Sequence, residues 1–137
     1  MDQIVKLKTD GSFELELDYF QHHKKAIGYE WDDNSPKVSR LYDDKLIDLL
    51  GAPRKSLEPL TQAHKDLARS IQDCYERTFF HMLNALHKQH ATDNLTIAGG
   101  CGMNSVANGK VHLHTPYKNI MFNQQQVMRA VQLVRRL

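Results

Sequence analysis

The chain has 137 residues, of which 41% are hydrophobic and 25% are charged, and its formal net charge is +2. This length is enough for one modest domain and too short for two. No apolar run approaches the roughly 20 residues that span a bilayer. The start of the chain lacks the apolar core of a secretion signal, and two cysteines cannot form a disulfide framework. Lys and Asp residues are interleaved, so we expect a cytoplasmic protein with neither a nucleic-acid nor a membrane partner.

The N-terminal part of the sequence predicts a hairpin and one short helix. Apolar and polar residues alternate over 3–17, and Asp10-Gly11 in the middle supplies the positive φ angles of a tight turn. The pattern is irregular from Tyr19 to Leu60, where residues 31–36 (WDDNSP) form a turn cluster. Within this stretch DDKLIDLLG predicts a short helix that ends at Gly51.

The strongest helix signal runs from Thr61 to about His90. Apolar and small residues recur there at steps of three and four, which predicts one stripe facing a core: Leu67, Ile71, Cys74, Thr78, Met82 and Leu86. A helix of this length measures about 40 Å, which is long for so small a domain. We therefore expect a larger structure around it, and an isolated chain that is marginally stable and self-associates through exposed apolar surface.

The last third of the chain predicts a strand, a glycine loop, a helix and a second strand. LTIA at 95–98 is a short buried strand, and MNSVANGKVH at 103–112 is a helix. NIMF at 119–122 supplies the second strand. This order is typical of a β-α-β unit, so the fold class is α+β or α/β, with a hairpin, a long helix and this unit.

The loop TIAGGCGMNSVANGK, residues 96–110, suggests two alternatives. Gly99 and Gly100 at a helix N-terminus would let a phosphate approach the main chain, and Asn104 could bind a ribose or phosphate. Alternatively, the two glycines only allow a strand and a helix to pack closely. The pattern alone leaves both possibilities open, because a single glycine loop is a weak signal.

The cysteines and histidines are a second set of residues with possible chemical roles. Cys101 at a helix N-terminus could act as a nucleophile if a base lay nearby, although a small inert residue is the more ordinary interpretation. The eight histidines include His87 and His90 on one helix face and the alternating pair His112 and His114. No carboxylate or cysteine completes a metal-binding set with them, so the sequence favours solvated polar faces and predicts neither a metal site nor a catalytic residue.

Several segments together resemble one family. LTQAHKDLARSIQDCYERTFFHMLNALHKQHATDNLTIAGGCGMNSVANGKV, residues 60–111, is similar to the carbamoyltransferases that modify antibiotics and nodulation factors. DGSFELELDYF and WDDNSPKVSRLYDDKLIDLLGAPR resemble the segment that precedes the helix in the same family. The likeness covers nearly all of residues 4–120 and combines unrelated motifs in the right order, so it is specific.

The resemblance implies a fold and a chemistry. The larger domain of these enzymes is an actin-like, ribonuclease-H-type ATPase domain, which makes carbamoyladenylate from carbamoyl phosphate and ATP and passes the carbamoyl group to a hydroxyl-bearing small molecule. The strand–Gly-Gly–helix element of that fold contacts the nucleotide, and Gly99, Gly100 and Asn104 stand at the matching positions. Cys101 lies where the family carries small residues. The family's iron-type divalent metal is held by a histidine pair and an Asp that this sequence lacks, so residues 1–120 are expected to be a partial, inactive domain.

Residues 121–137 depart from the family in a way that a frameshift would explain. The family reads Asn-Ile-Tyr-Val-Gln-Pro-Ala-Ala-Gly-Asp-Ala-Gly-Gly-Ser-Ile-Gly-Ala-Ala after the glycine-loop helix, and its Asp ligates metal. Deletion of one T just after the A of the Ile codon, in a suitable coding sequence for that stretch, yields residues 119–136 without a mismatch. We therefore expect a frameshifted tail. The alternative is a native tail helix with Val127, Val131, Val134 and Leu137 on one face.

Two rival functions remain at the level of sequence. A non-catalytic α+β interaction module would keep the core and bind no nucleotide. A cysteine-dependent enzyme would use Cys101 and would show fast, pH-dependent alkylation at that residue.

Overall fold

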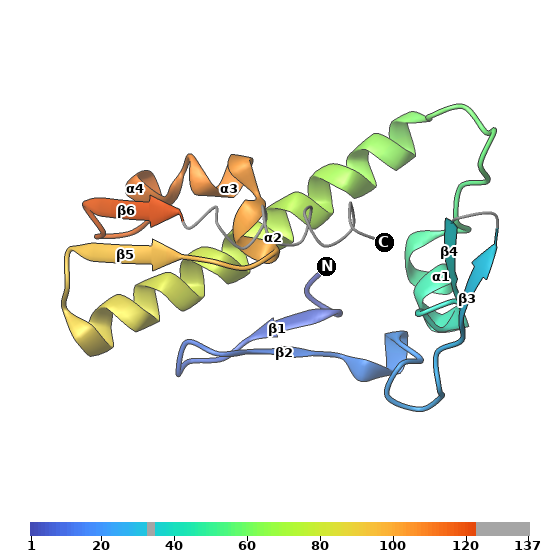
Figure 1. Ribbon diagram of the computed structural model, residues 1–137, viewed down its shortest axis with the longest axis horizontal. Coiled ribbons are helices and arrows are strands. Elements are labelled where there is room, and N and C mark those ends of the chain that lie inside the picture. Colours follow the sequence, from blue (N-terminus) through green and yellow to red (C-terminus); the bar gives the residue numbers. More distant parts are fainter. Residues whose placement is uncertain (33–34, 123–137) are drawn as a thin grey trace. The chain divides into compact units, whose positions relative to one another are not determined.

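The computed structural model describes residues 1–32 and 35–122, and Figure 1 shows the elements along them. The chain divides into two compact units. The N-terminal unit holds residues 1–8 and 13–75, and the C-terminal unit holds residues 9–12 and the chain from Glu76 onward. The long helix α2 contributes to both units. The mixed α/β class, with small sheets and one long helix, is as predicted.

The first hairpin forms with a wider turn than the sequence suggested. Strand β1 (Val5–Leu7) pairs antiparallel with β2 (Phe13–Leu15). Only Gly11 has a positive φ, +92°, so the expectation of positive angles at both Asp10 and Gly11 was wrong. The Asp10 carboxylate instead accepts hydrogen bonds from the backbone N–H and hydroxyl of Ser12, at 2.9 and 2.7 Å. This side-chain turn replaces the second left-handed residue.

The stretch that looked irregular contains a second hairpin and the expected short helix. After a 3-10 turn at Leu17–Tyr19, β3 (Tyr29–Asp32) pairs antiparallel with β4 (Ser35–Val38). The sequence missed these strands because each is four residues long and Pro36 interrupts the pattern. Helix α1 (Asp44–Leu50) begins after the Asp43 cap and ends at Gly51, where φ is +89°. Its end at Gly51 confirms the prediction.

Helix α2 (Gln62–His90) confirms the extent of the predicted helix but not its buried face. Of the six residues in the proposed core stripe, Cys74 is buried as expected, but Ile71, Met82 and Leu86 are 51%, 39% and 40% exposed. In the C-terminal unit Phe80 and Leu83 are buried instead. They lie on a different face of the helix, so the simple three- and four-residue repeat selected the wrong side for this part of α2. Apolar residues occur on more than one face, and periodicity alone cannot choose between faces.

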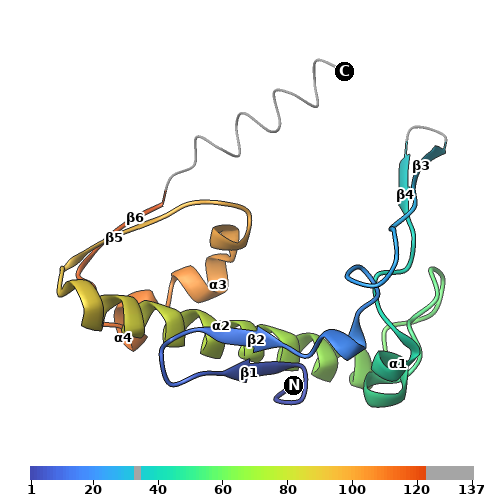
Figure 2. The ribbon, with the colours of Figure 1, turned by 90° about the horizontal axis from the view of Figure 1, so that it is seen from below.

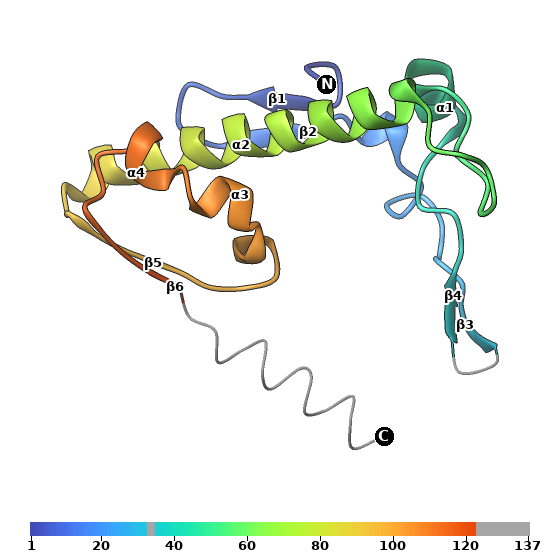
Figure 3. The same ribbon diagram turned by 90° about the horizontal axis from the view of Figure 1, so that it is seen from above.

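The C-terminal unit is built around a parallel strand pair. Strand β5 (Asn94–Ile97) pairs in parallel with β6 (Asn119–Phe122), in a register that places Leu95 beside Ile120. Helix α2 and the crossover helices α3 and α4 all lie on one side of this pair (Figures 2 and 3). The core on that side contains five buried residues: Phe80, Leu83, Leu95, Val111 and Tyr117. The parallel pairing confirms the predicted β-α-β unit.

The crossover differs from the single helix expected over residues 103–112. It consists of a 3-10 turn (Cys101–Met103), α3 (Ser105–Asn108) and α4 (Val111–His114). Asn104 lies between the first two pieces with extended angles of −69° and 93°, so it breaks the helix and caps α3. Gly109 then ends α3 before α4 begins. The residue types were helix-compatible, but the capping preference of Asn104 determined the first break. Gly109 keeps right-handed angles, −63° and −15°, so it is not a left-handed helix cap.

The C-terminal tail is largely outside this description. Met121 and Phe122 belong to β6, whereas residues 123–137, which carry the rest of the expected frameshifted segment and the alternative tail helix, lie outside the described residues. Over residues 1–32 and 35–122, no helix has the length and apolar character needed to cross a membrane.

Candidate functional site

The glycine loop begins at the carboxyl end of β5. Gly99 has a φ of +96°, a conformation that favours glycine. Gly100 has right-handed helical angles, −61° and −41°, and stands just before the 3-10 turn. In open α/β sheets, ligands bind outside the carboxyl ends of the strands, and this loop occupies such a position.

The space around the glycines separates two roles that the sequence could not. A Cβ atom built on Gly99 or on Gly100 would meet no atom of the described residues within 4 Å. A Cβ on Gly102 would lie 2.7 Å from Cγ2 of Ile97. Gly102 is therefore the glycine that allows close packing of the loop against the strand. Packing does not explain Gly99-Gly100, and the second of the two sequence interpretations is wrong for that pair.

Asparagine side chains hold the loop in shape. The Asn104 side-chain oxygen accepts a hydrogen bond from the backbone N–H of Ala107 at 3.1 Å, which caps α3. Asn108 donates from Nδ2 to the carbonyl of Gly102 at 2.7 Å. Its Oδ1 is buried and has no hydrogen-bond partner among the described residues. The sequence analysis did not predict that Asn108 and Gly102 hold the loop in shape. Their spacing of six residues around the turn was the sequence signal for this contact.

The role predicted for Asn104 has a structural competitor. Its oxygen is engaged in capping, and contact with a ribose or phosphate stays a prediction. The dipole argument also weakens, because the helices after the loop have four residues each rather than ten. A macrodipole needs aligned peptides over several turns, so exposed backbone around Gly99 and Gly100 is the stronger feature.

The one lysine in the loop is directed at the long helix. Lys110 Nζ lies 2.6 Å from Glu76 Oε2, and the two side chains are 40% and 13% exposed. Glu76 lies at the middle of α2, in the C-terminal unit, so this ion pair ties the start of α4 to that helix. The lysine of the loop is therefore paired with a residue of α2.

The remaining sequence candidates have separate surroundings. Cys101 is exposed and forms no disulfide with Cys74, and its use as a nucleophile stays a prediction. His87 packs edge-on against Tyr117 with ring centroids 5.1 Å apart, and His114 stacks on Phe80 at 4.7 Å. His87 is partly buried, so the expectation of a solvated face was wrong for it, whereas His114 is exposed as expected. Burial raises the pKa of the Tyr117 hydroxyl. In the part of the chain that the structure describes, no three His, Cys, Asp or Glu side chains gather as a metal site.

A parallel strand pair joined through an open glycine loop is a mixed α/β arrangement, and comparison with known proteins narrows the class of protein. The family described as carbamoyltransferase N-terminus matches residues 1–125. The chain belongs to this family. The match confirms the family resemblance that the sequence motifs indicated.

Three relatives are similar to parts of the chain. An uncharacterized Synechocystis protein, sll1178, is 36% identical over 88% of this chain and 18% of its own length. Nodulation protein NolNO of Sinorhizobium fredii is 37% identical over 53% of this chain and 11% of its own. Nodulation protein NolO of Bradyrhizobium diazoefficiens is 38% identical over 42% and 11%. The chain thus spans less than a fifth of these relatives. No solved structure matches it, so the actin-like fold stays a prediction.

Proposed function

We propose that this chain is part of an O-carbamoyltransferase that uses carbamoyl phosphate and ATP. In this proposal water cleaves carbamoyl phosphate to carbamate and phosphate, and carbamate displaces pyrophosphate from ATP to form carbamoyladenylate. The acceptor hydroxyl then loses its proton and its oxygen bonds to the carbamoyl carbon as AMP leaves. The residues that contact the nucleotide are Gly99, Gly100 and Asn104. The 137-residue chain alone would bind nucleotide weakly and would not complete the reaction, because it carries one loop of the cleft.

One observation carries the proposal: the main chain at Gly99-Gly100 is open on the side where a ligand would approach. The loop lies at the carboxyl end of a parallel strand, where α/β sheets bind ligands. Glycine leaves room for phosphate oxygens to reach backbone N–H groups. Family membership supplies the carbamoyl chemistry, and the open loop supplies a place for an anionic substrate.

The strand pair supports the idea of a larger actin-like domain. Parallel sheets are normally covered on both faces. Leu95 and Ile120 face the helices, whereas Met121 is 67% exposed. A two-stranded parallel sheet with one open face is the unfinished part of a wider sheet, and the relatives have several times more chain to complete it.

The metal requirement is assigned to residues outside the described site. A divalent metal, iron in type, would neutralise phosphate charge during transfer. Its ligands would include an Asp that the frameshift removes. We propose that one T has been lost after the codon for Ile120. The family match covers residues 1–125 and does not extend over the rest of the tail.

Nucleotide binding at the loop can be tested by NMR. ATP at millimolar concentration should shift the backbone amides of residues 99–104 in the wild-type chain. Gly100→Val should abolish these shifts, because its side chain would occupy the open approach, and should leave helix content unchanged. Gly109→Ala is the matched control, because Gly109 follows α3 and lies outside residues 99–104. Equal shifts in wild type and Gly100→Val would rule out this site.

The frameshift can be tested from the coding DNA. Restoring one T after the Ile120 codon should replace the sequence from Met121 onward with Tyr-Val-Gln-Pro-Ala-Ala-Gly-Asp. This frame should continue past the present stop codon into the rest of the family sequence. The repaired product should bind a divalent cation through oxygen and nitrogen ligands and consume carbamoyl phosphate. A restored frame that closes within a few codons would contradict the proposal.

Experiments on the same protein samples distinguish the two rival functions. A non-catalytic interaction module predicts no ATP-dependent shifts at any concentration used. A cysteine-dependent enzyme predicts that Cys101 reacts with iodoacetamide much faster than an unfolded-chain thiol, with a pH profile displaced to lower values. Cys74 is buried and serves as the internal comparison.

A further inference from the structure

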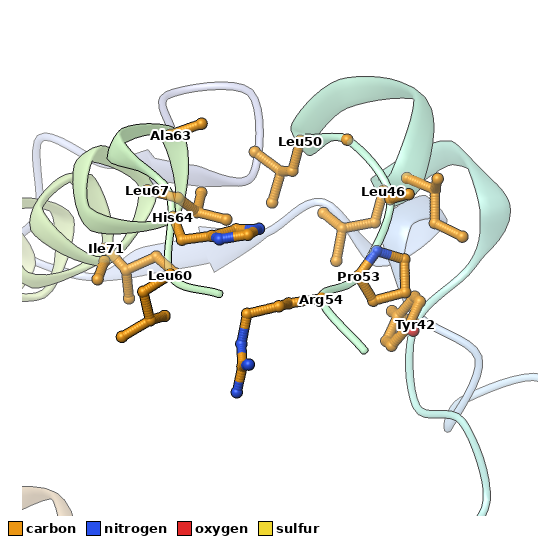
Figure 4. Close-up of a pocket in the computed structure, with 14 residues that line it drawn as sticks. Tyr42, Leu46, Leu50, Pro53, Arg54, Leu60, Ala63, His64, Leu67 and Ile71 are labelled. Atoms are coloured by element: carbon orange, nitrogen blue, oxygen red, sulfur yellow. The ribbon is translucent and has the colours of Figure 1, made fainter. Parts of the chain in front are cut away.

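A cavity of about 470 Å³ lies in the N-terminal unit, between α1 and the first turns of α2. Figure 4 shows its walls. Its fourteen lining residues all fall between Tyr42 and Ile71, so the cavity belongs to one unit and lies far along the sequence from the glycine loop. A volume of this size is within the range of small-molecule sites, roughly 300–1,000 Å³.

The walls of the cavity are apolar and incompletely covered. Leucines from α1 face leucine and isoleucine side chains at the start of α2, and the chief contributors are Leu46, Leu50, Leu60, Leu67 and Ile71. Leu60 and Ile71 remain 66% and 51% exposed. Exposed apolar surface that lines a cavity favours an apolar occupant, since each buried Å² contributes about 25 cal/mol.

Two nitrogen-bearing side chains define the polar character of the cavity. Arg54 donates from Nη1 to the carbonyl of Glu58, and in Figure 4 its side chain lies between Leu60 and Pro53. The Nδ1 atom of His64 accepts the backbone N–H of Thr61 at 3.1 Å. A neutral His64 therefore carries its proton on Nε2, and its ring points toward Leu50 in Figure 4. Both side chains thus offer donors to an occupant.

The charge of the lining is one-sided. Arg54 is charged, and none of the fourteen lining residues is Asp or Glu. A carboxylate accepts hydrogen bonds without donating any, and Arg binds carboxylates with charge-assisted bonds. A cationic or uncharged polar head would find no complementary carboxylate in the lining.

We propose that this cavity binds a small amphiphile with an aliphatic body and a carboxylate head. The aliphatic body packs on the leucines of α1 and α2, and the carboxylate lies at Arg54, with His64 as a second donor. The proposal does not rest on carbamoyl transfer, and it assigns the N-terminal unit a ligand of its own.

Decanoate, titrated below its micelle concentration into the 137-residue chain and followed by backbone NMR, tests the proposal. Its amide shifts should concentrate in residues 42–71. Decanol, which has the same chain and no charge, should bind about tenfold more weakly. Arg54→Gln should weaken decanoate binding about tenfold and leave decanol binding unchanged, because only the charge-assisted bonds are lost.

Two further variants control the experiment. Arg69→Gln makes the same charge change on α2 at a residue that does not line the cavity, and it should leave decanoate affinity within twofold of wild type. Ala63→Trp places a large ring at the cavity wall from an exposed helix position and should block both ligands. Equal affinity for decanoate and decanol would overturn the proposal. Failure of decanoate to bind the wild-type chain would also overturn it and would leave another protein segment as the occupant.

Discussion

The two units use similar amounts of apolar sequence with different results. The C-terminal unit encloses Ala107 and Val111 completely, because a parallel pair and its crossover bring strand, loop and helix residues to one centre. In the N-terminal unit, Trp31 and Leu57 are 68% and 96% exposed. Among the described residues of this unit, each sheet has two strands that are neighbours in sequence, so strand pairing joins only segments that are close in the chain. Closure of a core depends on contacts between distant segments more than on composition.

The largest expected effect comes from truncating one leucine in each unit. Leu83→Ala should lower the free energy of unfolding by about 2–5 kcal/mol, because it leaves a cavity in the C-terminal core. Leu60→Ala removes the same atoms from an exposed position and should cost less than about 0.5 kcal/mol. Urea denaturation measures both. Similar costs would mean that the two units are equally well packed.

Two glycines with positive φ, one in each unit, also test the difference in packing between the units. A Cβ at Gly11 would overlap the Cβ of Ala85, and the residue also has a φ of +92°. Gly11→Ala should therefore lower thermal stability by about 2–3 kcal/mol or more. Gly51→Ala carries the same backbone strain in open space and should cost about 1 kcal/mol. If the two variants melted together, the close approach of the hairpin turn to α2 would be in doubt.

The contribution of an ion pair to stability should increase with the burial of its carboxylate. Lys110→Met removes the partner of Glu76, whose side chain is 13% exposed, and we expect a loss of about 1–2 kcal/mol. Lys6→Met breaks the Lys6–Glu16 pair, which is 55% and 38% exposed, and should leave the free energy of unfolding almost unchanged because water screens the pair. Chemical denaturation at two salt concentrations provides the measurement. A larger loss for Lys6→Met would reverse the interpretation.

The smallest expected effect is a loss of stability at alkaline pH that arises in the C-terminal core. Burial raises the pKa of Tyr117 above the ordinary value of 10.0. The unfolded chain then loses this proton at lower pH than the folded chain, so the stabilisation is full below about pH 10 and declines as pH rises through the folded value. The decline is at most about 1.4 kcal/mol per pH unit. Tyr117→Phe should flatten it, and an unchanged alkaline slope in that variant would assign the effect to another group.

Local sequence signals predicted the elements whose boundaries depend on single residues. Gly51 ended α1, and alternation located the first hairpin. The helix to His90 and the parallel strands were also predicted, because their patterns are long or strongly apolar. The buried face of α2 was not predictable, since apolar residues occur on more than one face and the partner strands decide which is covered. The second hairpin was not predicted for a different reason. Its strands are too short for their residue pattern to be distinguished from irregular sequence.

The candidate site was predicted in position more than in mechanism. Gly99 and Gly100 were singled out by spacing, but only the structure distinguishes them from Gly102, which packs on Ile97. The sequence also did not predict the capping bond of Asn104, because Asn side chains occur both as helix caps and in ligand contacts. The residue types limit which contacts are possible, and the distances in the structure show which contacts each residue makes.

The conformation of Gly100 has a consequence for mutational tolerance. Its backbone is right-handed and its side-chain position is open, so folding makes no demand for glycine there. In a saturation library scored for protein abundance, position 100 should accept almost any residue, whereas position 99 should favour Gly, Asn and Asp because of its left-handed backbone. Any intolerance that appears at position 100 only under selection for activity would then report the ligand directly, free of the usual confusion between lost folding and lost function.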